Sequence, residues 1–249
     1  MKKAIRTIVT ALVASILASV CSGAASNGFY VMRKKDHKRP ALDPWLSYIT
    51  DHNGYYIGED DKVIYLTFDA GYENGNVEKI LNTLDRHNVK GNFFVLDNII
   101  RRNTDLIIRM AKNGHVVANH SAHHKDMTEM SYEECERELT ELESVYKELT
   151  GYTLSKFFRP PEGKCSKKLL DNVSALGYKT VFWSFAYADW DNNRQPDKEY
   201  AIKLITDNTH NGEIILLHPT SKTNAAILDS LITKWKDEGY RFATLDELK

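Results

Sequence analysis

The sequence predicts an α/β fold whose parallel sheet curls into a compact barrel of βα units, and three observations indicate this class. First, short runs of β-branched and aromatic residues alternate with longer amphipathic segments from Val63 to the end of the chain. Second, segments of helical length between strands call for crossover connections and a parallel sheet. Third, about seven such units follow one another closely, which suits one barrel better than two domains.

Each strand is predicted from a short apolar run, and each helix from a period near 3.6 residues. In the first unit, VIYLTFD (63–69) predicts a buried strand, and NVEKILNTLDRHN (76–88) predicts a helix with Val77, Ile80 and Leu84 on one face. Further strands are predicted at 91–96, 115–120, 155–161, 179–185, 213–219 and 241–245. Further helices are predicted at 105–114, 132–149, 167–177, 197–208 and 224–239.

The first 25 residues differ from the rest of the chain. A basic start, MKKAIR, precedes an apolar run, TIVTALVASILASV, and the small residues CSGAAS. This order is typical of a signal peptide, so we expect export across the cytoplasmic membrane. The apolar run is shorter than the roughly 20 residues of a spanning helix, which leaves an uncleaved N-terminal anchor as the alternative.

Residues 26–62 contain prolines and paired basic residues but no sustained period. We expect an N-terminal extension that packs aromatic residues such as Trp45 and Tyr56 on the domain formed by residues 63–249.

The charge balance limits the possible partners. The chain has 33 basic and 34 acidic residues, so it shows neither the basic surface of a nucleic-acid-binding protein nor a polybasic membrane patch. No nucleic-acid partner is expected, no obligate protein partner is inferred, and a neutral or weakly charged substrate fits better.

Polar residues capable of chemistry follow five predicted strands. They are Asp69, His120 with His124, Arg159, Asp189 and His218. In a parallel α/β protein these positions converge at the carboxyl edge of the sheet. Three of them have a structural alternative: Asp69 as a turn or capping residue, Arg159 in a surface salt bridge, and His218 as a buried hydrogen-bonded histidine.

His120 and His124 in HSAHH are four residues apart. That spacing puts two imidazoles on one face of a helical turn, where both can reach one divalent cation. Alone, the pair is equally compatible with surface or packed histidines. His123 would point elsewhere on such a turn and is expected to be a bystander.

Together these residues resemble the NodB-type polysaccharide deacetylases, carbohydrate esterase family 4. The motifs occur in the family's order: TFDAG (67–71), HSAHH (120–124), RPPEG (159–163), ADW (188–190) and LLHP (216–219). The resemblance covers roughly residues 63–249. It implies a deformed (β/α) barrel that hydrolyses the acetamide of N-acetylated sugars.

The resemblance also implies a role for each matching residue. Asp69 would be the catalytic base held by Arg159, and His218 the acid held by Asp189. His120 and His124 would bind a divalent metal ion, zinc by preference, with manganese, cobalt or magnesium as alternatives. The expected substrate-binding residues are Tyr72, with a backbone N–H near it for the oxyanion, together with Trp190, Pro161 and Gly163.

Ala70 departs from the family pattern, because the family places a metal-binding aspartate there. Either the site is inactive or it works with two histidines and water. The whole phrase TFDAGYENG, with FWSFAYADW, resembles the delta-lactam-biosynthetic de-N-acetylases of spore-forming bacteria, a branch with a substitution at this position.

That branch implies a specific function. The enzyme would remove acetyl from N-acetylmuramic acid residues of peptidoglycan glycan strands after an N-acetylmuramoyl-L-alanine amidase has stripped their peptides, towards the muramic δ-lactam of spore cortex. It would act in the cell wall or the forespore intermembrane space. The alternatives are an N-acetylglucosamine deacetylase of peptidoglycan or chitin, an esterase on acetylated xylan, and a non-catalytic glycan-binding module with a decayed metal site.

Overall fold

The computed structural model describes residues 28–248, so the predicted signal or anchor at 1–25 lies outside the described residues. Within this range one parallel sheet has the strand order β1-β6-β5-β4-β3-β2-β8-β7, and β9 also pairs with β2. The strands are β1 (Gly54–Tyr55), β2 (Val63–Ala70), β3 (Asn92–Val95), β4 (Val116–Asn119), β5 (Ser155–Phe158), β6 (Lys179–Val181), β7 (Phe185–Ala186), β8 (Glu213–Leu217) and β9 (Arg241–Phe242).

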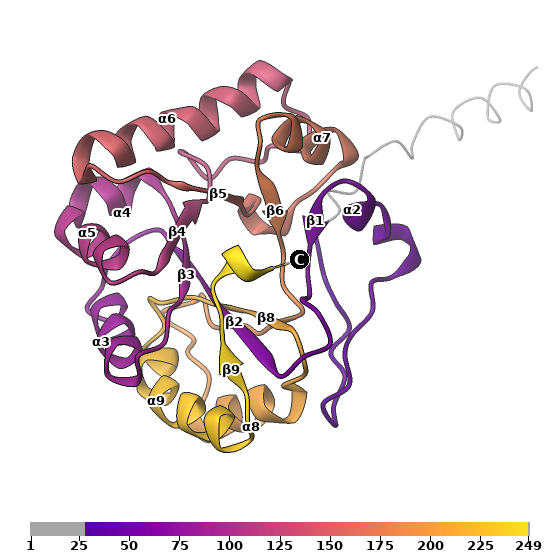
Figure 1. Ribbon diagram of the computed structural model, residues 1–249, viewed down its shortest axis with the longest axis vertical. Coiled ribbons are helices and arrows are strands. Elements are labelled where there is room, and N and C mark those ends of the chain that lie inside the picture. Colours follow the sequence, from indigo (N-terminus) through magenta and orange to yellow (C-terminus); the bar gives the residue numbers. More distant parts are fainter. Residues whose placement is uncertain (1–27, 249) are drawn as a thin grey trace, which may run out of the picture.

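Helices surround this sheet on its outer side (Figure 1). The α-helices are α2 (Tyr48–Asp51), α3 (Val77–His87), α4 (Asp97–Arg102), α5 (Thr104–Lys112), α6 (Tyr132–Thr150), α7 (Lys167–Ala175), α8 (Lys198–Asn208) and α9 (Lys222–Asp237). Three short 3-10 helices lie at Pro44–Leu46, Pro161–Gly163 and Leu245–Glu247. The deformed (β/α) barrel expected from the sequence is confirmed.

The barrel nearly closes through a short link between its two ends. Strands β6 and β7 lie near opposite ends of the strand order, yet only residues 182–184 separate them in the chain. The Phe182 amide donates to the Tyr55 carbonyl of β1 at 2.7 Å, and the Ser184 amide donates to the Ile214 carbonyl of β8 at 2.8 Å. The predicted single strand at 179–185 is therefore wrong, because the chain crosses between the two ends of the sheet at this point.

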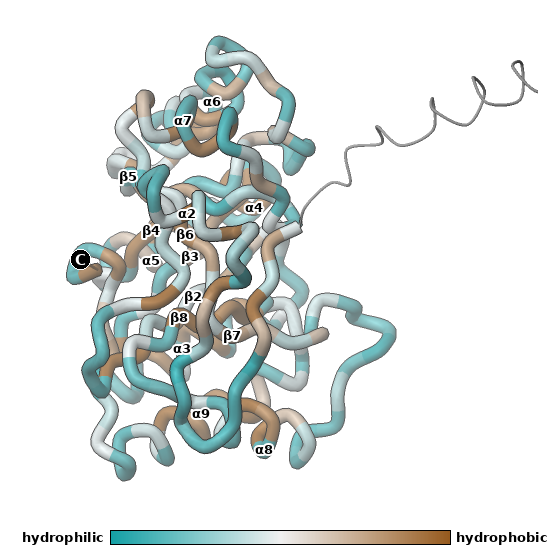
Figure 2. Tube along the Cα trace, turned by 90° about the vertical axis from the view of Figure 1, so that its right-hand side faces the viewer, coloured by the Kyte–Doolittle hydropathy of each residue, from teal (hydrophilic) through white to brown (hydrophobic). Residues whose placement is uncertain are grey.

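Alternation along β2 divides the core into two layers. Ile64, Leu66 and Phe68 point outward into the main apolar cluster with α3 and α9, whereas Val63 and Tyr65 belong to a second cluster on the other face of the sheet. Figure 2 shows the hydrophobic residues along the central strands and the hydrophilic ones on the outer loops. Asp69 continues the row of Val63 and Tyr65, which carries its carboxylate towards the mouth of the barrel.

Most predicted helices are confirmed within one or two residues of their ends, but the six-residue helix α4 was not expected. The segment before residue 63 contributes β1, which pairs with β6. Tyr56 packs on an apolar cluster there, whereas Trp45 is 43% exposed and its ring lies 5.8 Å from that of Tyr30 in a tilted arrangement. Among residues 28–248 no helix is long and apolar enough to cross a membrane.

Candidate active site

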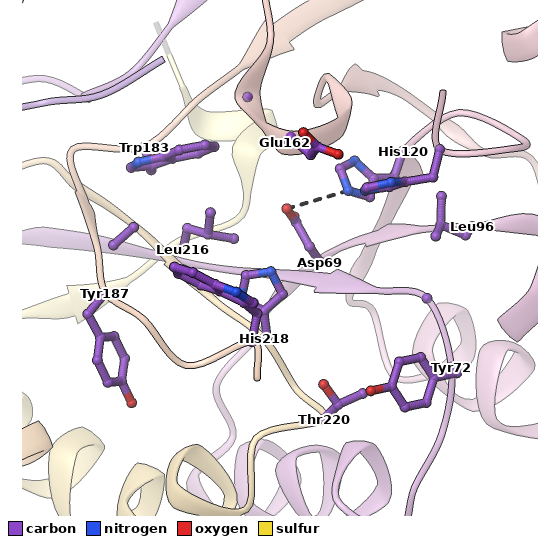
Figure 3. Close-up of a pocket in the computed structure, with 15 residues that line it drawn as sticks. Asp69, Tyr72, Leu96, His120, Glu162, Trp183, Tyr187, Leu216, His218 and Thr220 are labelled. Atoms are coloured by element: carbon purple, nitrogen blue, oxygen red, sulfur yellow. Dashed lines mark ion pairs between the residues drawn. The ribbon is translucent and has the colours of Figure 1, made fainter. Parts of the chain in front are cut away.

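A pocket of about 770 Å³ opens where the carboxyl ends of the strands meet (Figure 3). Four residues with catalytic or metal-binding chemistry line it: Asp69 at the end of β2, His120 and His124 after β4, and His218 after β8. The other lining residues are Gly71, Tyr72, Leu96, Glu162, Gly163, Trp183, Ala186, Tyr187, Trp190, Leu216 and Thr220. The topology thus brings together segments that are about 150 residues apart in the chain.

Asp69 is the carboxylate that lies beside the two imidazoles of the pocket. Its side chain is 10% exposed, and its Oδ1 accepts a hydrogen bond from Nη1 of Arg159 at 2.9 Å. Burial acts to raise the pKa of Asp69, but the charge of Arg159, with contributions from His120 and His218, outweighs burial and lowers the pKa. Asp69 is therefore ionised at neutral pH and able to accept a proton.

Arg159 is fully buried and fixes Asp69 from behind the pocket. Its Nε and Nη2 donate to the carbonyls of Val181 and Phe182 at 3.0 and 2.8 Å, and its guanidinium lies 4.2 Å from the centre of the Phe94 ring. Both carbonyls lie where β6 runs into the link that nearly closes the barrel. One side chain therefore ties this link to the carboxylate on β2, leaving little freedom to either.

His120 lies beside Asp69 and presents one nitrogen to it. Its Nδ1 hydrogen-bonds the carbonyl of Arg159 at 2.8 Å, which makes Nδ1 the protonated nitrogen. Its Nε2 lies 3.6 Å from Oδ2 of Asp69, the contact drawn in Figure 3. Burial lowers the pKa of His120 to about 4. The imidazole is therefore neutral at pH 7, with the lone pair of Nε2 facing the pocket.

His124 lies beside His120 as expected, but its backbone conformation is not the helical turn that the spacing predicts. Residues 120–126 form no helix, and both Ser121 and His124 have left-handed backbone angles, with φ of 68° and 54°. The helical-turn geometry expected from the four-residue spacing is wrong, but the rings of His120 and His124 still lie 5.1 Å apart between centroids. His123 turns away and hydrogen-bonds Glu138 at 3.1 Å.

The donor set fits a divalent metal ion with few protein ligands. His120 has the orientation typical of metal-binding histidines, one ring nitrogen bonded to a carbonyl and the other free. Ala70 is fully buried in the main apolar cluster and does not line the pocket. Within residues 28–248 no three His, Cys, Asp or Glu side chains form a ready-made ligand set. The two imidazoles would leave the remaining coordination positions to water and substrate.

His218 and Asp189 form a second acid and base pair on the opposite side of the pocket. Nδ1 of His218 lies 2.7 Å from Oδ1 of Asp189, and the backbone N–H of His218 donates to Oδ2 at 2.8 Å. Asn224 also donates to Asp189, which is fully buried. Burial acts to lower the pKa of His218, but the hydrogen bond and charge of Asp189 outweigh it and raise the pKa. The His218 side chain is 26% exposed, so its other nitrogen can reach a substrate.

The predicted substrate-binding residues divide into two groups. Tyr72, Trp190 and Gly163 line the pocket, and Trp190 lies with its ring centroid 6.3 Å from that of His218. Gly163 has a φ of 66°, and a Cβ there would lie 2.6 Å from the indole of Trp183, so only glycine fits. Pro161 is buried in the turn before Glu162 and does not line the pocket.

Comparison with known proteins decides the family. Residues 57–181 match the family model described as Polysaccharide deacetylase. The peptidoglycan-N-acetylmuramic acid deacetylase PdaA of Bacillus subtilis is 42% identical over 219 residues, which cover 87% of this chain and 83% of that protein. The chain belongs to the polysaccharide deacetylase family.

Solved structures place the deacetylase in carbohydrate esterase family 4. The structure of Bacillus subtilis PdaA, a family 4 carbohydrate esterase, superposes with a TM-score of 0.86 at 39% identity and covers 89% of this chain and 96% of that one. A peptidoglycan-N-acetylglucosamine deacetylase of Listeria monocytogenes, PgdA, is 35% identical over 76% of this chain and 39% of that protein. A family 4 pseudoenzyme from Bacillus anthracis has a TM-score of 0.72 at 26% identity, covering 78% and 68% of the two chains.

The deacetylase is thus a hydrolase that acts on the amide of acetylated sugars, in a family whose members generally depend on metal ions. Sequence reasoning missed several of its pocket residues, among them Glu162, Trp183 and Leu216. Glu162 stands within the RPPEG motif in a left-handed conformation, with φ of 56°. A non-glycine residue held in that conformation is a signal of a constrained site, but it is visible only in the structure.

Proposed function

We propose that this chain is a metal-dependent de-N-acetylase of peptidoglycan that removes acetyl from N-acetylmuramic acid residues already stripped of peptide. The observation that carries the proposal is the placement of Asp69 and His218 on opposite sides of one pocket, with two imidazoles beside Asp69. Amide hydrolysis needs a base for the attacking water and an acid for the departing amine, and these two residues have suitable protonation states. The similarity to PdaA supports the choice of sugar.

Asp69 would accept the proton of the attacking water. Its lowered pKa keeps it unprotonated, and Arg159 aims its carboxylate into the pocket. The role of Arg159 is positioning, since its guanidinium is fully buried and does not line the pocket. Removing a base of this kind costs about 10² to 10⁴ in rate.

His120 and His124 would hold the metal ion, and zinc suits two imidazole ligands best, with manganese, cobalt or magnesium as alternatives. When bound, a divalent metal ion activates water and polarises the acetamide carbonyl. The Arg159 carbonyl keeps Nε2 of His120 unprotonated for this purpose.

His218 would donate a proton to the amine as it leaves. Asp189 raises the pKa of His218, so the imidazolium persists to a higher pH than for an ordinary histidine. Trp183 and Leu216 supply an apolar wall in Figure 3 against which the acetyl methyl group would pack. Tyr72, Trp190 and Gly163 would border the glycan, and a backbone N–H near Tyr72 would stabilise the oxyanion.

The product chemistry supports the place of this step in δ-lactam formation. Deacetylation frees an amine on the sugar carbon next to the one that bears the lactyl ether. Once an amidase has removed the peptide, that ether ends in a free carboxylate, which can condense with the amine into a cyclic amide. The enzyme would therefore act outside the cytoplasmic membrane, in the cell wall or the forespore intermembrane space, after N-acetylmuramoyl-L-alanine amidase.

Acetate release from peptidoglycan tests this proposal. Peptidoglycan pretreated with an amidase is compared with untreated material, first with EDTA and then with zinc restored, beside an Asp69→Asn variant. The expected result is release that requires zinc, Asp69 and removal of the peptides. No release with any divalent metal would contradict a catalytic role.

Two alternatives rest on specific observations. The similarity to the Listeria glucosamine deacetylase favours N-acetylglucosamine as the sugar, and reduction and sugar analysis of the product would show which amine is freed. Ala70 and the similarity to a pseudoenzyme favour a glycan-binding protein without activity. Retained glycan binding without acetate release would support that second alternative.

A further inference from the structure

A second hollow shares Trp190 with the reaction pocket. It has a volume of about 430 Å³ and is lined by Ala188, Trp190, Asp191, Arg194, Gln195 and Pro196. Trp190 is 61% exposed and lines both hollows. A sugar bound in the reaction pocket therefore has this second hollow within reach of its substituents.

The turn that carries Arg194 is tied to the catalytic groups. Nε2 of Gln195 donates to the carbonyls of Asp189 and Asp191, each at 2.9 Å, and its Oε1 accepts from the hydroxyl of Ser221 at 2.6 Å. Asp189 is the residue that holds His218, and Ser221 caps helix α9. These hydrogen bonds therefore hold the turn that lines the second hollow in a fixed position relative to His218.

The charges around the two hollows are unequal. Among residues 28–248 no lysine or arginine lines the reaction pocket, and its rim carries the carboxylate of Glu162, which pairs with Lys164 at 3.0 Å. Asp191 also lines the second hollow, but its Oδ1 accepts the amide of Asn193 at 2.9 Å. Among residues 28–248 the guanidinium of Arg194 has no ion pair and no hydrogen bond. Lys164 compensates the charge of Glu162, and Asp191 is turned to the amide of Asn193, so the guanidinium of Arg194 is left as a cation that an anionic substituent can contact.

We propose that Arg194 binds the lactyl carboxylate of the muramic acid residue whose acetamide lies between Asp69 and His218. This inference rests on the proposed function and names the residue that selects its substrate. The lactyl ether stands on the carbon next to the acetamide, so turning the acetamide to Asp69 can place the carboxylate in the second hollow. The planar guanidinium matches a carboxylate with two parallel hydrogen bonds.

The same contact explains why muramic acid that still carries a peptide would not be a substrate. In peptide-bearing muramic acid the lactyl group is an amide without charge, and it continues into a bulky chain. N-acetylglucosamine has a hydroxyl at that carbon. Arg194 therefore distinguishes stripped muramic acid from both, by charge in the first case and by the missing group in the second.

Steady-state kinetics of Arg194→Gln test the proposal, with Arg102→Gln as the matched control. Arg102 is an exposed arginine at the end of α4 that lines neither hollow. On amidase-treated glycan fragments, Arg194→Gln should raise KM by about 10- to 100-fold, as expected for loss of a charge-assisted hydrogen bond. Its effect on kcat should be smaller, Arg194→Lys should restore part of the loss, and Arg102→Gln should behave as wild type.

Selectivity separates recognition of the carboxylate from a general weakening of glycan binding. The ratio of kcat/KM on amidase-treated glycan to kcat/KM on N-acetylglucosamine oligomers should fall at least about tenfold in Arg194→Gln. An unchanged KM on treated glycan, or an equal loss on both substrates, would overturn the role of Arg194 and leave the proposed function standing. A wild-type enzyme that releases no acetate from treated glycan would overturn the proposed function and this inference together.

Discussion

The two sides of the pocket use the same pair of partners, an aspartate and a cationic side chain, in opposite orientations. On one side Arg159 is fully buried and the carboxylate of Asp69 faces the pocket; on the other, Asp189 is fully buried and the imidazole of His218 faces it. The pKa of Asp69 is lowered and that of His218 is raised. The member of each pair that reaches the substrate keeps its charge, so one side becomes a base and the other an acid.

Replacing Asp69, the member of the first pair that faces the pocket, should have the largest effect. Asp69→Asn keeps the size of the side chain but removes the proton acceptor, so acetate release should fall by about 10² to 10⁴. Acetate assays on amidase-treated glycan, with circular dichroism as a check on folding, measure this. A loss below tenfold would mean that another group accepts the proton.

Replacing the buried member of the same pair should reduce stability as well as activity. Arg159→Met leaves Asp69 without its partner and frees the carbonyls of Val181 and Phe182. The free energy of unfolding should drop by about 3 to 5 kcal/mol, the cost of leaving a buried charge unpaired. Urea denaturation gives this value, and a drop below about 1 kcal/mol would show that the pair does not constrain the fold.

The histidines offer a comparison within one loop. His124→Gln should weaken zinc binding to the protein at least about tenfold, because one of two imidazole ligands is lost. His123→Gln, one residue away and turned to Glu138, should leave zinc affinity within about twofold. Calorimetric titration of zinc into each variant makes the comparison without any assay of turnover. Equal losses in both variants would contradict the assignment of His124 as a ligand.

Much of this arrangement could be predicted from the sequence, because the positions and ends of the strands follow from hydrophobic patterns. Asp69, Arg159 and His218 each follow an apolar run, and parallel topology brings such positions together. The approach of His124 to His120 could not be predicted correctly, since it depends on left-handed angles at Ser121 and His124 rather than on a helical turn.

The near-closure of the barrel was equally hidden from the sequence. The run KTVFWSF has the composition of one strand. However, the carbonyls of Val181 and Phe182 accept hydrogen bonds from Arg159, which also holds the carboxylate of Asp69, about 90 residues before Arg159 in the chain. A contact between distant residues overrides the local preference there. Glu162 was missed for a similar reason, because nothing in RPPEG indicates that its backbone turns into the pocket.

The pH dependence of kcat/KM in the wild type and in Asp189→Asn tests the opposed pairs most directly. In the wild type the pKa of Asp69 is lowered and that of His218 is raised. The pH range over which kcat/KM is constant should therefore be wider than the ordinary pKa values of an aspartate and a histidine would give. Asp189→Asn removes the charge that raises the pKa of His218, so the alkaline limb should move to lower pH while the acid limb stays in place. A shift of the acid limb, or no shift of either, would contradict the assignment of His218 as the acid held by Asp189.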